Sequence, residues 1–135
     1  MPRRALTGPS HYAALLIAAR IAFAAACLVV GYGVFAPPGH GVSVFPWDKA
    51  EHFTAFFGLM GLAIVAFPGT PLWVLAVSLS FAGAAIEVIQ ATPLVRRDAD
   101  VWDWVADTLG ILAVVGAMIG AKLRRAMAEH WGWAA

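Results

Sequence analysis

Hydrophobic residues along this chain gather into four long stretches that are separated by short polar segments. The stretches cover residues 12–36, 50–67, 71–90 and 104–121. Each approaches the roughly 20 residues that a helix needs to cross the hydrocarbon core of a bilayer. The shortest still span about 27 Å at the usual helical rise, which suits a thin bilayer. The pattern predicts an all-α polytopic membrane protein, a bundle of about four transmembrane helices forming one domain over residues 1–135.

Composition supports a membrane protein and excludes several other classes. The 135 residues are 61% apolar and 13% charged, whereas soluble domains are roughly half apolar and a quarter charged. The mean hydropathy is +0.79. A net charge of +1 leaves no basic face for nucleic acid. The single cysteine, Cys27, excludes an intramolecular disulfide and a cysteine-based metal knuckle.

The polar breaks predict the topology. Residues 68–71 allow only a tight reversal, so the second and third helices are adjacent and antiparallel. An even number of spans puts both chain ends on one side of the membrane. Cations flank the spans at these ends: Arg3, Arg4, Lys122, Arg124 and Arg125. The positive-inside rule then predicts cytoplasmic termini and a multi-pass protein of the cell inner (cytoplasmic) membrane.

The first stretch has a competing interpretation as a cleaved signal peptide, because a basic start precedes a short apolar run at residues 12–19. Arg20 interrupts that run, and apolar sequence continues to residue 36. We therefore expect a retained span in which Arg20 snorkels to the cytoplasmic headgroups.

Small residues in the helices indicate close helix packing. Gly116 and Gly120 form a G-x-x-x-G pattern in the fourth stretch. We expect these glycines to pack inside the bundle, and the alternative is a face for a homo-oligomer.

Three polar segments, at residues 48–52, 87–90 and 96–107, fall on the same predicted side of the membrane. Each contains two polar residues about one helical turn apart, which share one helix face. These pairs are Asp48 and His52, Glu87 and Gln90, and Asp103 and Asp107.

The free-energy cost of placing charged residues in a bilayer suggests that this clustering has a role. A charge inside the bilayer costs about 2.5 to 3.5 kcal/mol on insertion scales, so intramembrane acids face one another or a wet cavity. We predict a polar pocket open to the outer leaflet, with Lys49, Arg96 and Arg97 as partners of the acids. The candidate cluster is Asp48, Lys49, His52, Glu87, Gln90, Arg97, Asp103 and Asp107. The structural alternative is that these charges only cap the helices and join them through ion pairs.

The three segments together resemble the VanZ-like family of small bacterial membrane proteins. That family has Asp-Lys-x-x-His-Phe at the start of one span, Glu-x-x-Gln at the end of the next, and then Arg with Asp-x-x-x-Asn or Asp-Thr-x-Gly into the last. Here the segments read Asp48-Lys49-Ala50-Glu51-His52-Phe53, then Glu87-Val88-Ile89-Gln90, and then Arg97 with Asp103-Trp104-Val105-Ala106-Asp107-Thr108-Leu109-Gly110.

The resemblance covers about residues 45–120. Phe56 stands where the family often has Tyr, and Asp107 where it often has Asn. The family is named for a protein linked to low-level resistance to the lipoglycopeptide teicoplanin. The resemblance therefore implies a membrane protein of the cell envelope without implying a settled mechanism.

Two functions remain open on this sequence. The first is binding of membrane lipids at the outer face, through a lipid headgroup or glycolipid whose phosphate Lys49 and Arg97 would hold. The second is an intramembrane acid/base enzyme, a hydrolase or transferase. In that enzyme Asp103 or Glu87 would be the general base and His52 an acid or base.

Cofactor and ion chemistry are less well defined by the sequence. A divalent metal held by Asp48, His52, Asp103 and Asp107 is a further alternative. No ligand spacing is diagnostic, however, so we assign no metal ligand and leave the cofactor unknown. A proton or ion pathway is disfavoured because the inner halves of the spans hold few polar residues.

Overall fold

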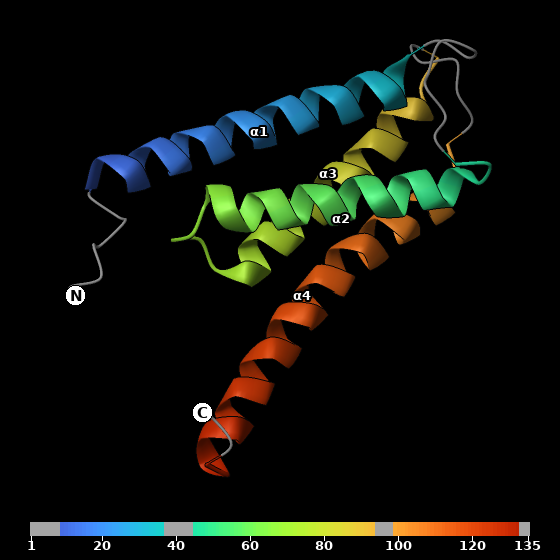
Figure 1. Cartoon of the computed structure of the whole chain (residues 1–135). Helices are drawn as coiled ribbons and strands as arrows, with labels where there is room; N and C mark the ends of the chain where they lie inside the picture. Colours follow the sequence, from blue (N-terminus) through green and yellow to red (C-terminus); the bar gives the residue numbers. More distant parts are fainter. Residues whose placement is uncertain (1–8, 37–44, 94–98, 133–135) are drawn as a thin grey trace.

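The computed structural model describes residues 9–36, 45–93 and 99–132. These residues form four helices and no strand. The helices are α1 (Pro9–Phe35), α2 (Asp48–Ala66), α3 (Leu72–Gln90) and α4 (Val101–His130) (Figure 1). All four are long and apolar enough to cross a membrane. The predicted all-α bundle of four transmembrane helices is therefore confirmed.

The last helix extends beyond the apolar stretch that was assigned to the fourth span. α4 ends at His130, whereas the apolar stretch ends at residue 121. Hydropathy marks where a helix leaves the hydrocarbon and not where it stops. Residues 122–130 are mostly good helix formers and contain no Gly or Pro. Gly132, with a φ of 67°, follows directly after the helix, as is common at helix C-termini.

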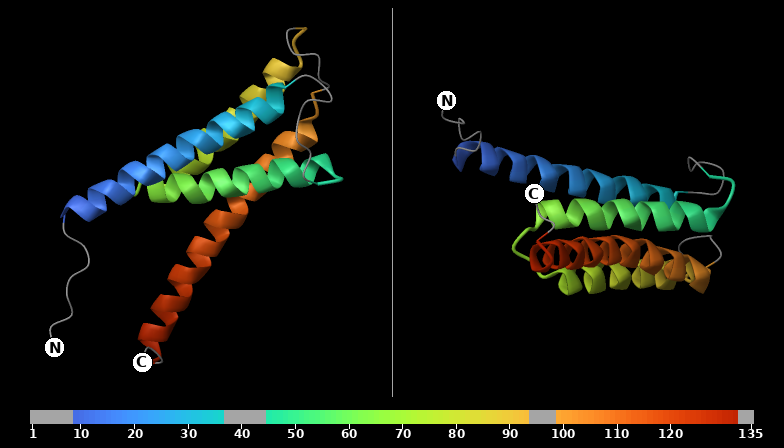
Figure 2. Two further views of the ribbon diagram at one scale, coloured as in Figure 1. Left: turned by 45° about the horizontal axis from the view of Figure 1, so that its top comes forward. Right: turned by 60° about the horizontal axis from the view of Figure 1, so that its bottom comes forward.

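α2 lies at the centre of the bundle. It contacts α1, α3 and α4, and α3 also packs along α4. Figure 2 shows α2 between α1 on one side and the α3–α4 pair on the other. The core consists of buried residues from α2, α3 and α4: Phe56, Leu59, Met60, Ala63, Leu79 and Ile111. Most other large apolar side chains face outward, as expected where lipid is the solvent.

Two polar contacts fix neighbouring helices away from the core. Ser80 Oγ lies 2.9 Å from Thr108 Oγ1, which joins α3 to α4. Arg20 Nε donates to the carbonyl of Ala66 at 3.2 Å, and its guanidinium lies over the Phe67 ring at 5.8 Å. Arg20 thus satisfies a free carbonyl at the end of α2, where the helix dipole favours a cation.

α4 approaches α2 most closely at Gly110, which is buried. A Cβ atom there would meet the Phe53 carbonyl oxygen and lie 3.0 Å from the Phe57 nitrogen. Gly116 and Gly120 are exposed, and nothing lies within 4 Å of a Cβ built on either. The expectation that these two glycines pack inside the bundle is wrong for the described residues. Their alternative role in a homo-oligomer stays a prediction.

We predict that Gly110→Ala destabilises the protein by about 1 to 3 kcal/mol, because the added methyl group forces two backbones apart. Gly116→Ala is the matched control in the same helix, since its methyl group meets open space. Thermal unfolding of both variants in detergent measures the difference. Equal stability of Gly110→Ala and the wild type would contradict the close crossing of α2 and α4.

Candidate functional site

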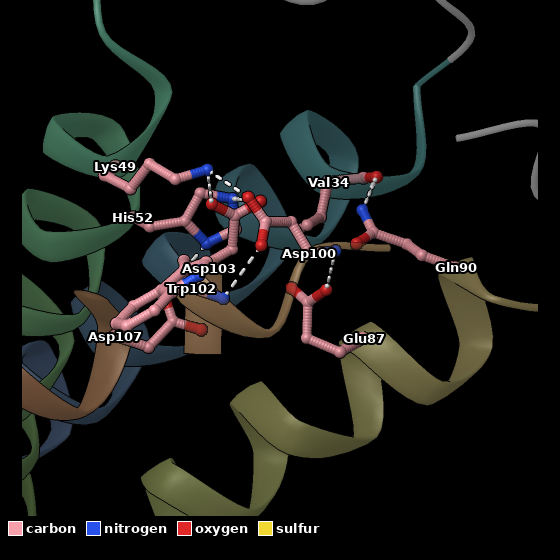
Figure 3. A network of polar contacts seen from close by, with 9 residues as sticks. All are labelled: Val34, Lys49, His52, Glu87, Gln90, Asp100, Trp102, Asp103 and Asp107. Atoms are coloured by element: carbon pink, nitrogen blue, oxygen red, sulfur yellow. Dashed lines mark hydrogen bonds and ion pairs between the residues drawn. The ribbon is translucent and has the colours of Figure 1, made fainter. Parts of the chain in front are cut away.

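Three helices bring their polar ends together (Figure 3), at the end of the bundle away from the two chain termini (Figure 1). α2 begins here, α3 ends here, and α4 begins here. We call the resulting group the polar cluster; it consists of Asp48, Lys49, His52, Glu87, Asp100, Asp103 and Asp107. The sequence predicted this convergence from topology alone. It placed Arg97 in the site too, but Arg97 and Arg96 lie outside the described residues.

Lys49 links α2 to the start of α4. Its Nζ lies 2.5 Å from Asp100 Oδ2 and 2.8 Å from Asp103 Oδ1. Lys49 was predicted as an available partner of the deepest acids, Glu87 and Asp107, but its partners in the structure are Asp100 and Asp103. Asp103 is buried, whereas the side chains of Lys49 and Asp100 are partly exposed. A buried carboxylate and a rim carboxylate therefore share one ammonium group.

Asp100 is a cluster member that the sequence analysis missed. It is the N-cap residue of α4, and its Oδ1 accepts a hydrogen bond from the Trp102 nitrogen at 3.0 Å. An Asp directly before the fourth apolar stretch is a signal for this role. The ammonium of Lys49, assisted by the Trp102 N–H, lowers the pKa of Asp100. Asp100 therefore stabilises the fold above the unfolded pKa, about 3.9, and loses this contribution as pH falls through its lower folded value.

His52 and Asp107 form the deepest pair of the cluster. His52 Nδ1 lies 2.9 Å from Asp107 Oδ1, and Asp107 is 0% exposed. A carboxylate acceptor places the imidazole proton on Nδ1, which leaves Nε2 as the free ring nitrogen of neutral histidine. Nε2 lies 3.8 Å from Asp103 Oδ2, which is too long for a hydrogen bond. The pair therefore orients the ring so that Nε2 faces the rest of the cluster.

Gly83 makes room for Asp107. A Cβ atom at Gly83 would lie 2.7 Å from Asp107 Oδ2. This oxygen is buried and has no hydrogen-bond partner among the described residues. Gly83 thus lets α3 approach the fully buried carboxylate of Asp107. A small residue in an apolar stretch gives no sign of this role in the sequence.

Glu87 joins α3 to the beginning of α4. Its Oε2 accepts a hydrogen bond from the Asp100 nitrogen at 2.9 Å. Its other oxygen, Oε1, is buried without a hydrogen-bond partner in the described part of the chain. Glu87 lies in the predicted site, and its visible contact positions the N-cap of α4.

Gln90 does not belong to the cluster. Its Nε2 donates to the Val34 carbonyl at 2.9 Å, and the side chain lies toward α1 (Figure 3). The prediction that Gln90 lines the site is corrected, because its position at the end of α3 faces the end of α1. Its alternative assignment as an interhelical hydrogen-bond donor is confirmed.

Asp48 completes the cluster at the surface. It is exposed, while Asp103 and Asp107 below it are buried. Asp48, His52 and Asp103 each offer one ligand atom, and these three atoms all lie within 4.8 Å of one another. The cluster thus runs from an exposed rim to a buried carboxylate and combines hydrogen-bond acceptors, one ammonium group and one imidazole. Such groups can accept hydroxyl protons, transfer a proton or hold a cation.

We predict that Gly83→Ala destabilises the protein by about 1 to 3 kcal/mol, because the methyl group displaces the Asp107 carboxylate from His52. The loss shrinks in an Asp107→Ala background, where the methyl group fills vacated space. A double-mutant cycle in thermal or denaturant unfolding measures this coupling. Gly61→Ala, which meets nothing within 4 Å, serves as the control. Strictly additive effects of the two substitutions would argue against the contact.

Comparison with family models, with curated proteins and with solved structures found no match to this chain. The resemblance to the VanZ-like family thus stays a prediction from the three polar segments.

Proposed function

We propose that this protein binds the polar headgroup of an envelope lipid, a hydroxyl-rich headgroup such as that of a glycolipid, at the outer face of the cell inner membrane. The observation that carries the proposal is the gradation of the polar cluster. Exposure to solvent decreases through the cluster: Asp48 is exposed, Lys49 and Asp100 are partly exposed, and Asp103 and Asp107 are buried. A gradation of this kind suits the interface of a bilayer, where the apolar core gives way to polar headgroups.

Charge favours a headgroup that donates hydrogen bonds. The described cluster holds five carboxylates, one ammonium group and one imidazole. Carboxylate oxygens accept hydrogen bonds from sugar hydroxyls. Lys49 is already engaged by Asp100 and Asp103, so binding a phosphate would require it to exchange one of these partners. Contacts to hydroxyl groups therefore supply more of the recognition than contacts to phosphate.

The orientation supports the outer face. The basic residues at the two chain ends favour cytoplasmic termini, and the polar cluster lies at the opposite ends of the helices. Together with the VanZ-like resemblance, this position suggests an effect on the cell envelope or on susceptibility to lipoglycopeptides of the teicoplanin type. If the protein binds an envelope lipid that lies near the site where lipoglycopeptides act, this binding would change susceptibility to them.

Native mass spectrometry of the detergent-purified protein tests headgroup binding. We expect a lipid adduct on the wild type that Asp103→Asn loses, because the variant removes a buried charge while keeping an oxygen beside Lys49. Asp48→Asn, at the exposed rim, weakens the same adduct with less effect on folding. Glu129→Gln is the matched control, since it removes an exposed carboxylate at the far end of α4. Identical spectra without lipid from folded wild type and Asp103→Asn would contradict the proposal.

One observation favours a second candidate, an intramembrane hydrolase or transferase. His52 is held by Asp107 through Nδ1 and presents Nε2 to the cluster. A carboxylate that fixes the ring and tautomer of a histidine is a common arrangement for general acid–base catalysis.

Incubation in vesicles of envelope lipids separates the two candidates. An enzyme converts a lipid to a product seen by mass spectrometry, and His52→Gln lowers the rate by about 100-fold or more because general acid–base catalysis is lost. A binding protein forms the adduct and leaves the lipids unchanged. Product formation at equal rates by wild type and His52→Gln would exclude His52 as the catalytic acid or base.

A further inference from the structure

The polar cluster contains three groups whose outer atoms converge without bonding to one another. Asp48, His52 and Asp103 offer ligand atoms within 4.8 Å of one another, and they come from two helices. We propose that these three residues bind one divalent transition-metal ion, Mn²⁺ or Zn²⁺. This proposal concerns the protein alone and does not depend on lipid binding.

The distance between His52 and Asp103 is the first step of the argument. His52 Nε2 and Asp103 Oδ2 are 3.8 Å apart, beyond the reach of a hydrogen bond. Metal–nitrogen and metal–oxygen bonds to such ligands are about 2.0 to 2.2 Å long. One ion between the two atoms would therefore reach both with little movement of either side chain.

The second step is that His52 and Asp103 are each held in place by a contact to the other polar atom of the side chain. Asp107 Oδ1 bonds the other nitrogen of His52, and Lys49 bonds the other oxygen of Asp103 (Figure 3). Metal-binding histidines usually donate their second ring N–H to a carboxylate or a carbonyl, which fixes the tautomer and orients the ring. Asp107 supplies that contact from a fully buried position. Nε2 and Oδ2 thus face one space with their geometry already set.

Charge balance around Asp103 is the third step. Asp103 is only 5% exposed, and its Oδ1 pairs with Lys49 Nζ at 2.8 Å. Lys49 also pairs with Asp100, so two carboxylates share one ammonium group, and a bound cation would supply further balancing charge. The Asp48 side chain makes no hydrogen bond or ion pair with another residue in the described ranges, and it is exposed. It is therefore free to close over an ion held by His52 and Asp103.

Ligand chemistry selects the class of ion. One imidazole and two carboxylates suit zinc or manganese better than calcium, which prefers oxygen ligands alone. Three protein ligands leave a coordination position open, as in catalytic rather than structural zinc sites. An oxygen atom of solvent or of a bound molecule would occupy that position.

Titration of the full-length, chelator-treated protein in detergent with Mn²⁺ alone tests the site. The electron paramagnetic resonance signal of free Mn²⁺ measures binding, and Zn²⁺ is added as a competitor. We expect one Mn²⁺ per chain, displaced by Zn²⁺, and at least a tenfold loss of affinity in both His52→Gln and Asp48→Asn. Asp48 is exposed, so Asp48→Asn keeps the test valid where His52→Gln fails to fold.

Glu51→Gln is the control, because Glu51 lies on the first turn of α2 but outside the three ligands. Its affinity should match the wild type. An equal loss in Glu51→Gln would show general attraction of cations to an acidic surface and overturn the site, as would unchanged affinity in Asp48→Asn. The titration adds no lipid, and native mass spectra of the same preparation show whether a lipid is bound, so failure of metal binding and failure of lipid binding are distinguished.

Discussion

A carboxylate buried in an apolar bundle is the constraint on which this structure depends. Asp107 is fully buried, and an isolated charge in such surroundings is too costly to persist without partners. His52 supplies the partner from α2, and Gly83 supplies the space on α3. α4 carries Asp107 itself, so a single side chain determines how three helices meet. Lys49 and Asp103 repeat this pairing nearer the surface, where exposure to solvent lowers the cost of the charges.

The two ends of the bundle are held together by different physics. At the polar cluster, ion pairs and hydrogen bonds join α2, α3 and α4. Toward the middle of α2, apolar packing around Met60 and the close approach at Gly110 replace them. α1 has no residue in the polar cluster, but Phe23, Ala26, Cys27 and Val30 pack against the apolar core. α1 packs along α2 and is fixed near its C-terminal end by the Gln90 contact to Val34 and near its middle by the Arg20 contact to Ala66. The helix that is least embedded is thus tied by side chains that donate to backbone carbonyls.

The sequence predicted the membrane spans and the residues that share a helix face. Long runs of apolar residues indicate segments that lie in the bilayer, so the four spans could be placed. A spacing of one helical turn placed Asp48 with His52 and Asp103 with Asp107. Pairing between helices depends on how each helix is rotated about its axis, and this rotation cannot be derived from the sequence of any one helix. The sequence therefore did not predict that Gln90 faces α1, that Asp100 shares Lys49, or that Gly110 rather than Gly116 forms the close crossing. The end of α4 could not be read from the apolar stretch for a related reason, because hydropathy falls at Lys122 while helix propensity does not.

Different atoms of the same side chains in the polar cluster stabilise the fold and remain available for chemistry. His52 uses Nδ1 to hold Asp107, and Asp103 uses Oδ1 to hold Lys49, while Nε2 and Oδ2 of the same residues face one another at the surface side. The inner atoms carry the contacts between helices, so the outer atoms stay in position without having to stabilise the fold. Asp107 has no atom at the surface, and any effect that it has on binding or proton transfer must pass through the orientation of the His52 ring. An amide at position 107 could still accept a hydrogen bond from Nδ1. It would orient the ring without the negative charge, so the change from carboxylate to amide separates the role of position from the role of charge.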